Sequence, residues 1–237
     1  MKSKAFRLDR FIRAHTTYSA ADTRGLIAQG RILLDGKPAG SIQQRVTAFT
    51  LVHLDGICLQ NNEPVYIMLN KPKGVVSATK DARHTTVLDI IEHPQKASLH
   101  IAGRLDFNTT GLILLTNDGA WSRKITEPDS KLEKEYQVRL KSPVTEDYIK
   151  TFKAGMFFPY EGITTAPATL TLLSEHTAKL RITEGKYHQI KRMFGRFQNE
   201  VVELHRTSMG SIVLDETLAY GDYRLLTPAE VATGFQR

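Results

Sequence analysis

An aspartate between two apolar stretches is the residue of this chain best suited to chemistry. Asp106 lies in the segment 103–119, which continues through the apolar run Leu112–Leu115 to an Asn-Asp-Gly turn. Arg104 stands two residues before it. Loops between buried strands display their side chains at the surface, where catalytic residues are concentrated. Aspartate also forms turns and caps helices, so residue type alone leaves a structural role open.

A basic side chain in the segment 187–197 is a candidate partner for that carboxylate. His188 and Arg192 are expected to point nearly away from the buried face of a helix in this segment, with Lys191 on its flank. From the flank an ammonium group can reach a pocket and keep a nearby carboxylate ionised. An ordinary surface lysine would show the same spacing. The apolar residues that predict the helix recur at i, i+3, i+4 and i+7: Ile190, Met193, Phe194 and Phe197.

An aromatic residue lies on an alternating segment, 133–138. The alternation predicts a strand with Tyr136 and Val138 on one face and Glu135 and Gln137 on the other. An inward tyrosine can be part of the core, with its hydroxyl satisfied. It can also be a flat platform for a nucleobase. The pattern is compatible with both roles.

Several reaction classes lack their sequence patterns. The eight histidines show no HExxH-type spacing, and the single cysteine, Cys58, excludes an internal disulfide and a multi-cysteine metal site. There is neither a GxxxxGK[ST] loop nor a GxGxxG motif, which argues against nucleoside triphosphates and dinucleotides as ligands. The basic turn 70–74, with Lys71 and Lys73, is compatible with a phosphate contact.

Positive charge is concentrated near the N-terminus. The 237 residues carry a formal charge of +7, with 41% hydrophobic and 24% charged residues, as in folded soluble proteins. Residues 1–56 hold nine Lys/Arg and four acidic residues, so the longer remainder is nearly neutral. This asymmetry favours nucleic-acid binding by the N-terminal part, although a solvated basic surface would look similar. No apolar run is long enough to cross a bilayer and the N-terminus does not resemble a signal peptide, so we expect a cytoplasmic protein.

The hydrophobic periodicity predicts an α+β protein with two modules. In the first, two short helices, the second capped by Ser19, precede a small β unit with an Asp35-Gly36 hairpin. Short turns between neighbouring strands predict a mainly antiparallel sheet in the second, flanked by helices. Its strands are expected near 65–69, 98–102, 111–116, 134–140, 168–174, 178–183, 201–205, 211–214 and 223–226. Its helices are expected near 86–91, 119–126, 145–154, 187–198 and 228–234.

The N-terminal module resembles the S4 RNA-binding domain. The resemblance rests on two basic helices followed by a small β unit, which carry "RLDRFI" and then "GRILLDGKPAG". The S4 pattern often has an arginine directly after the capping serine, where this chain has Ala20; Arg24 is an alternative source of that charge. We therefore expect an S4-like domain over residues 1–56, a linker over 57–64 and a catalytic domain over 65–237.

The larger module resembles the pseudouridine synthases, in particular the branch that acts on small-subunit (16S) ribosomal RNA. The matching blocks are "LNKPKGVVSAT" at 69–79, "AGRLDFNTTGLILLTNDG" at 102–119, "KEYQV" at 134–138, "EGKYHQIKRMF" at 184–194, "EVVELHRTSMGSIVLD" at 200–215 and "GDYRLLT" at 221–227. The resemblance covers nearly the whole chain. It implies isomerisation of a uridine to pseudouridine, with no cofactor and no metal.

The resemblance also assigns roles to individual residues. It implies that Asp106 is the catalytic aspartate, that Tyr136 stacks on the target uracil and that Lys191 is the basic residue paired with Asp106. Many relatives have arginine at that last position, and a lysine would pair more loosely. Arg104 would enter the RNA where the base leaves it. The remaining expected RNA contacts are Arg7, Arg10, Arg13, Arg24, Arg31, Lys71, Lys73, His188 and Arg192.

The expected partner is ribosomal RNA, either 16S rRNA or an assembling small subunit, bound by a monomer without a membrane. Two alternatives remain open from the sequence. One is a synthase of the same family that acts on large-subunit 23S rRNA. The other, from a different class, is a non-catalytic S4-type RNA-binding factor for ribosome assembly.

Overall fold

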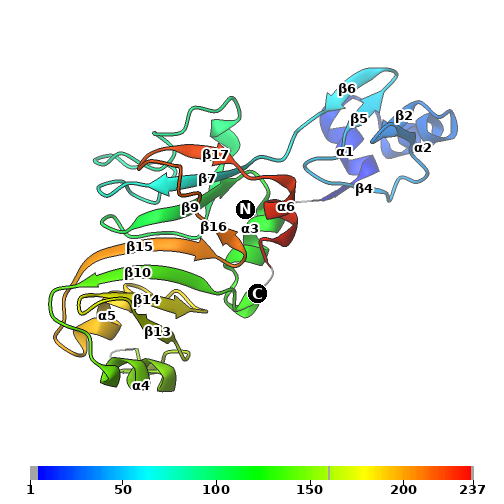
Figure 1. The fold of residues 1–237 in the computed structure, drawn as a ribbon. Coiled ribbons are helices and arrows are strands. Elements are labelled where there is room, and N and C mark those ends of the chain that lie inside the picture. Colours follow the sequence, from blue (N-terminus) through cyan, green and yellow to red (C-terminus); the bar gives the residue numbers. More distant parts are fainter. Residues whose placement is uncertain (1–4, 160, 236–237) are drawn as a thin grey trace. The chain divides into compact units, whose positions relative to one another are not determined.

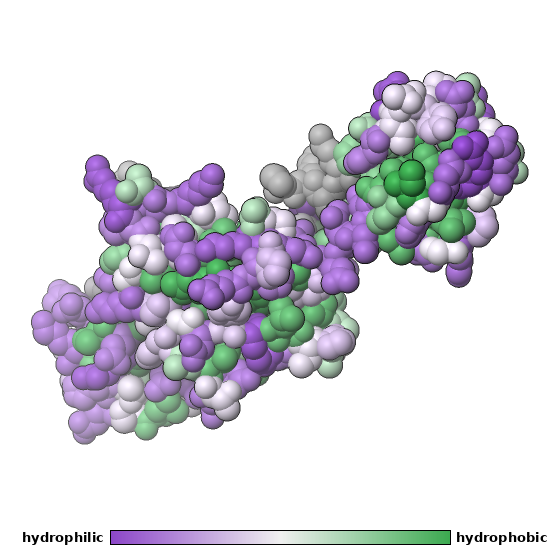
Figure 2. Space-filling view, turned by 90° about the horizontal axis from the view of Figure 1, so that it is seen from above, coloured by the Kyte–Doolittle hydropathy of each residue, from purple (hydrophilic) through white to green (hydrophobic). Residues whose placement is uncertain are grey.

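The structure, a computed structural model, divides the chain into two compact units. It describes residues 5–159 and 161–235. The first unit comprises Met1–Pro64 with Asp118–Ala120, and the second comprises Val65–Asn117 with Trp121–Arg237. Each unit has its own apolar core. Figure 2 shows that hydrophilic side chains cover much of the visible face of each unit, with apolar patches among these side chains. Within the described ranges, no helix combines the length and apolar character needed to span a membrane.

The first unit forms around a pair of short helices. Three apolar side chains recur along α1 (Leu8–His15). They are Leu8, Phe11 and Ile12, and all three are buried in the core of this unit, as their spacing predicts. Ser19 and Asp22 cap α2 reciprocally, side chain to backbone in each direction. The elements are β1 (Phe6–Arg7), α1 (Leu8–His15), α2 (Ala20–Ala28), β2 (Ile32–Leu34), β3 (Lys37–Pro38), β4 (Arg45–Val46), β5 (Val52–Leu54) and β6 (Ile57–Gln60).

Strand β6 corrects the prediction of a linker over residues 57–64. Its residues pair antiparallel with β5 at the edge of a small sheet ordered β3-β2-β5-β6. The connecting residues Asp55 and Gly56 both have left-handed backbone angles, with φ of 51° and 81°. Two such residues close a tight hairpin, so the chain returns along β5 instead of leaving the unit. The linker prediction is wrong for residues 57–60.

The second unit is built on a mixed but mainly antiparallel sheet, which confirms the α+β prediction. Figure 1 shows its strands side by side in the order β13-β14-β10-β15-β9-β7-β17, with β8 on β9 and β16 on β15. The ladder between β9 and β15 is parallel, and the other ladders are antiparallel. The strands are β7 (Tyr66–Lys71), β8 (His100–Ala102), β9 (Thr110–Thr116), β10 (Lys134–Leu140), β13 (Thr169–Leu172), β14 (Thr177–Ile182), β15 (Val201–Met209), β16 (Ile212–Val213) and β17 (Tyr223–Leu225), with a separate hairpin of β11 (Phe157–Phe158) and β12 (Ile163–Thr164).

The central strand β9 is buried on both faces. Ile113 and Leu115 contribute to one apolar cluster, while Leu112 and Leu114 contribute to another. Because successive strand residues point to opposite faces, a strand covered on both sides reads as a continuous apolar run. This explains the unbroken apolar run at 112–115 in the sequence and places the adjoining aspartate loop at the end of a rigid strand.

The helices of the second unit match the predicted segments with one exception. They are α3 (Gly119–Thr126), of which residues from Trp121 onward belong to this unit, α4 (Glu146–Ala154), α5 (Gln189–Gly195) and α6 (Pro228–Thr233), with short 3₁₀ turns at Lys96–Ser98 and Pro128–Ser130. The helix predicted at 86–91 is wrong. Thr86 forms an isolated bridge with Val76, and the chain then makes tight turns closed by backbone bonds from Asp89 to Thr86 and from Ile91 to Leu88.

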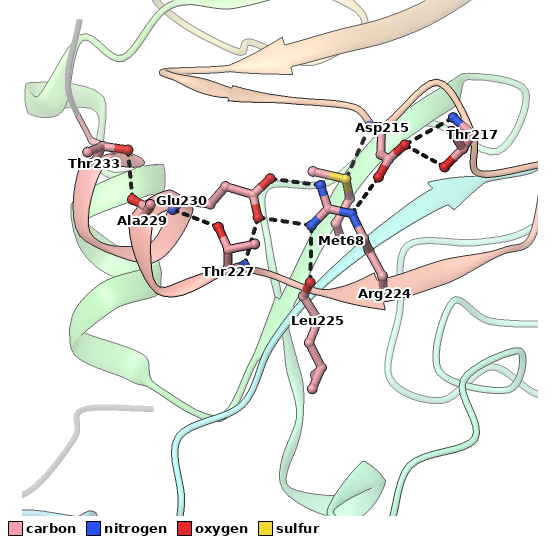
Figure 3. A network of polar contacts seen from close by, with 9 residues as sticks. All are labelled: Met68, Asp215, Thr217, Arg224, Leu225, Thr227, Ala229, Glu230 and Thr233. Atoms are coloured by element: carbon pink, nitrogen blue, oxygen red, sulfur yellow. Dashed lines mark hydrogen bonds and ion pairs between the residues drawn. The ribbon is translucent and has the colours of Figure 1, made fainter.

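An arginine near the C-terminus joins the last elements to the sheet. Figure 3 shows Arg224 of β17 between the carboxylates of Asp215 and Glu230, to which its guanidinium donates at 2.7–2.9 Å. Glu230 also caps α6 together with Thr227. The hydrogen bonds from Thr217 and Arg224 lower the pKa of Asp215 to about 2, so the pair stays ionised at neutral pH. This network holds α6 against the end of β17.

Candidate active site

The loop between β8 and β9 carries Asp106 at the mouth of a cavity. The side chain of Asp106 is 34% exposed, and its backbone oxygen accepts a hydrogen bond from the amide of Thr109 at 3.0 Å. Gly111, the second residue of β9, has φ of 99°, and a Cβ there would lie 2.3 Å from the backbone oxygen of Arg206. Only glycine fits this crossing. The loop is therefore locked to β15 where it enters β9.

Two basic side chains from the start of α5 approach the carboxylate of Asp106. Lys191 Nζ lies 3.9 Å from Oδ2, and His188 Nε2 lies 3.5 Å from the same oxygen. The structure thus brings Lys191 and Asp106 together as expected, at a distance that agrees with a looser pair than arginine would form. His188 differs from its predicted position opposite the apolar stripe. It precedes the helix with a left-handed backbone, φ 49°, which turns the ring towards the cavity.

Tyr136 forms part of the wall of the same cavity, which has a volume of about 280 Å³. It lies on β10 between Leu180 of β14 and Arg206 of β15, and it is 7% exposed. The cavity is also lined by Arg104, Thr109, Lys186, Tyr187 and Ile190. A flat ring on a rigid strand beside a half-buried carboxylate is an arrangement that can hold a planar base.

A buried arginine, to which the sequence pattern assigned no role, lies behind the loop. Arg206 of β15 is only 2% exposed, and its guanidinium donates to the backbone oxygens of Leu112 at 2.7 Å, Gly103 at 3.0 Å and Arg104 at 3.4 Å. Its Nη1 also lies 3.5 Å from the Tyr136 hydroxyl. The predicted strand 201–205 ended four residues too early, because β15 continues to Met209. Had it been extended, the alternation from Leu204 would have placed Arg206 on the inward face.

Lys71 is a second buried cation behind the loop, and the structure contradicts its predicted contact with RNA. Its side chain is fully buried, and Nζ donates to the backbone oxygens of Thr109 at 2.8 Å, Pro72 at 3.0 Å and Phe107 at 3.3 Å. Burial lowers the pKa of Lys71 to about 8; Asp106 opposes this shift and the charge of Arg206 adds to it. A lysine at the end of the buried strand β7 therefore supports the loop from within.

The other predicted contacts of the second unit differ in their accessibility. Arg104 is exposed at the cavity, and exposed Lys73 lines a neighbouring cavity of about 600 Å³ that shares Lys191 with the first. Arg192 instead pairs with Glu161 and packs over the ring of Phe158, 4.0 Å from its centroid. These contacts occupy its guanidinium in holding α5, so the geometry does not favour the predicted RNA contact of Arg192.

The predicted contacts of the first unit fall into two groups. Arg7 pairs with Asp9 at 2.8 Å, and Arg31 forms a two-pronged pair with Asp55 at 2.6 Å. All five side chains are exposed, and Arg10, Arg13 and Arg24 form no ion pair with the described residues. Exposed cations on short helices can meet phosphates at little cost in structure. Across the residues that the structure describes, no cluster of three or more His, Cys, Asp or Glu side chains is arranged to hold a metal ion.

Known proteins share both the sequence and the fold of this chain. The family model described as RNA pseudouridylate synthase matches residues 65–195. The ribosomal small subunit pseudouridine synthase A of Pseudomonas aeruginosa is 45% identical over 96% of this chain and 99% of its own length, and that of Escherichia coli is 43% identical over the same shares. A crystal structure of a pseudouridylate synthase superimposes with a TM-score of 0.71 at 38% identity, over 96% of this chain and 99% of that one. The chain belongs to the RNA pseudouridylate synthase family.

Proposed function

We propose that this protein isomerises a uridine in the RNA of the small ribosomal subunit to pseudouridine, with Asp106 as the reacting group. The observation that carries the proposal is the half-buried carboxylate of Asp106 at a cavity walled by Tyr136, with Lys191 and His188 beside it. The small-subunit substrate is supported by relatives of that name that match 96% of the chain at 43–45% identity.

The proposed chemistry needs no atom from outside the substrate. The bond between ribose C1′ and uracil N1 breaks, the ring turns over, and a bond from C1′ to C5 forms. The proton leaves C5, and N1 acquires one. An ionised carboxylate at Asp106 can attack the ribose or the base, or take up a proton, and Lys191 Nζ lies 3.9 Å from this carboxylate.

The target uridine must leave the folded RNA to reach Asp106. Tyr136 then offers a stacking surface, which is worth roughly 1–3 kcal/mol per base and offsets part of the cost of unstacking. Arg104, exposed beside the cavity, is placed to fill the gap that the base leaves. Tyr136 lies on β10, and the loop that carries Asp106 runs between β8 and β9 of the same sheet, so their separation is fixed before the RNA binds.

We propose that the first unit is an S4-like RNA-binding module. Its support is the order of two short helices and a small sheet, the sequence resemblance, and the exposed Arg10, Arg13 and Arg24. Phosphate contacts of this kind add salt-sensitive affinity with little sequence discrimination.

The substrate is tested with rRNA transcripts that carry tritium at uridine C5, because the reaction releases that label to water. Wild-type protein should release label from small-subunit rRNA and not from large-subunit rRNA, assayed both naked and in assembling particles. Release only from large-subunit rRNA would favour the alternative substrate within the family. Tight binding of small-subunit rRNA with no release in any substrate would favour the non-catalytic assembly factor.

A further inference from the structure

We propose that His188 is a positioning residue for the reacting carboxylate: with Lys191 it holds Oδ2 of Asp106 and leaves Oδ1 to act on the substrate. This inference rests on the proposed function, since it assigns a role within that reaction. The sequence predicted only an RNA contact for His188. The structure instead places its ring on the cavity wall beside the carboxylate.

The contacts of the carboxylate are one-sided. His188 Nε2 at 3.5 Å and Lys191 Nζ at 3.9 Å both approach Oδ2. A carboxyl group turns about its Cβ–Cγ bond, and this terminal torsion is only weakly restrained. Two basic groups facing the same oxygen favour one orientation of the carboxyl group, so the other oxygen keeps a fixed direction. A nucleophile or base that must meet one atom of an extruded nucleoside needs that fixed direction.

The backbone of His188 is strained in a way that serves this contact. Its φ of 49° lies in the left-handed region, which side-chain-bearing residues adopt rarely and which is retained where the surroundings demand it. A helical conformation would have carried the ring to the side opposite the apolar stripe. The left-handed residue instead begins the turn into α5 and directs the ring at Asp106.

One face of the His188 ring also packs against a neighbouring aromatic ring. It stacks on Tyr187 with centroids 3.9 Å apart and planes 21° apart. The stack fixes the ring plane, and with it the direction of Nε2. An imidazole can donate from Nε2 both when protonated and as the neutral Nε2–H tautomer. Catalytic hydrogen bonds are often long in a free enzyme, and we expect the 3.5 Å contact to shorten when substrate fills the cavity.

Two amide variants separate this role from an RNA contact. The side-chain nitrogen of His188→Gln reaches about as far as Nε2 and restores a donor to Asp106. The shorter side chain of His188→Asn does not reach, although asparagine tolerates the left-handed backbone better than most residues. The matched control is His176→Asn. His176 lies in the turn between β13 and β14, next to Thr177, whereas the cavity residue Ile182 lies at the opposite end of β14, so His176 is remote from the cavity.

The readouts are the single-turnover rate of label release at saturating RNA and the RNA dissociation constant. If the contact of His188 with Asp106 shortens to a hydrogen bond in the RNA complex, its loss should slow His188→Asn about 10- to 100-fold, with RNA affinity within about 2-fold of wild type. The Gln variant should recover to within about 3-fold, and the control should match wild type. Equal rates in all variants, or a loss of affinity that accounts for the slower reaction, would overturn the proposal.

Crystal structures of the two variants give a readout that does not depend on the reaction. The carboxyl group of Asp106 should keep its wild-type orientation in His188→Gln and rotate or become mobile in His188→Asn. An unchanged, ordered carboxyl group in the Asn variant would refute the positioning role even if wild-type protein released no label. Absence of release from wild type would instead count against the proposed function.

Discussion

The loop that carries Asp106 is held very differently on its two sides. On the side of the sheet, the fully or nearly fully buried cations Lys71 and Arg206 donate to its backbone oxygens. On the side of the cavity, His188 and Lys191 approach the carboxylate itself, and both side chains are more than one-third exposed. The same kind of charge thus serves two purposes. Buried cations fix the main chain, and accessible ones act on the reacting group.

The difference follows from what burial costs a charge. A buried cation loses its hydration and must recover it from several acceptors, and main-chain oxygens supply these without neutralising the charge. Lys71 and Arg206 therefore make the loop rigid. An exposed cation is screened by water, so its distance and orientation can still adjust when RNA binds. Substitutions of the buried cations should therefore mainly lower stability, whereas substitutions of the exposed cations should mainly lower the reaction rate.

The largest effect is expected from Arg206→Met. Removing the guanidinium takes away the hydrogen bonds to the backbone oxygens of Leu112, which is buried, and Gly103, which should lower the free energy of unfolding by about 3 kcal/mol. Urea unfolding followed through Trp121, the single tryptophan, reports on this unit. Arg139→Met is the matched control, since Arg139 is 57% exposed and pairs at the surface with Glu203; this substitution should cost less than about 1 kcal/mol. Equal losses in the free energy of unfolding for Arg206→Met and Arg139→Met would contradict a structural role of the buried arginine.

Lys71 should make stability depend on alkaline pH. Its pKa of about 8 in the folded protein lies below the usual 10.5, so the unfolded chain binds more protons between these values. Stability contributed at this site therefore rises as pH increases through that window. The free energy of unfolding of wild type relative to Lys71→Met should rise by about 2 kcal/mol between pH 8 and 10. A difference that stays constant with pH would mean that Lys71 is not held as a buried cation.

Lys191 should affect the reaction with little effect on folding. Lys191→Met should lower the single-turnover rate about 10-fold or more, because the carboxylate loses a facing charge, while urea unfolding changes by less than about 1 kcal/mol. Lys191→Arg should keep most of the rate, since a guanidinium can reach the same oxygen. A large loss of stability with an unchanged rate in Lys191→Met would show that Lys191 supports the fold, as Lys71 and Arg206 do.

The smallest effects are expected from the exposed arginines of the first unit. The double variant Arg13→Gln/Arg24→Gln should weaken RNA binding a few-fold and reduce the salt dependence of the dissociation constant by about one to two in logarithmic slope. Arg31→Gln is the control, because Arg31 is already paired with Asp55. An unchanged salt slope in the double variant would exclude this surface from the RNA contact.

Much of the fold could be predicted from local patterns. Periodicity located the helices and most strands, Ser19 and Asp22 form the expected cap, and Gly30 adopts the left-handed conformation that ends α2. The errors arose where a local signal was weak or misleading. The polar, turn-rich composition of residues 57–64 predicts a linker, whereas the Asp55-Gly56 hairpin returns the chain as β6. At 86–91 the apolar side chains of a tight turn resembled one face of a helix.

The candidate site was predicted only for residues whose chemistry is visible in the sequence. Asp106, Tyr136 and Lys191 could be assigned through the family resemblance, and the structure brings all three to one cavity. The inward direction of Arg206 could not be predicted, because it depends on how far β15 extends. The burial of Lys71 could not be predicted either, since a lysine after an apolar strand usually marks its solvent end. Neither role is a local property of the chain.

The most direct test of the central claim is to compare wild type with Asp106→Asn on small-subunit rRNA labelled with tritium at uridine C5. The amide has nearly the same size as the carboxylate but carries no charge and is a poor base. Label release should fall to background in single-turnover experiments, while the RNA dissociation constant stays within about 3-fold of wild type and unfolding is unchanged. Release at an undiminished rate from Asp106→Asn would show that this carboxylate is not the reacting group.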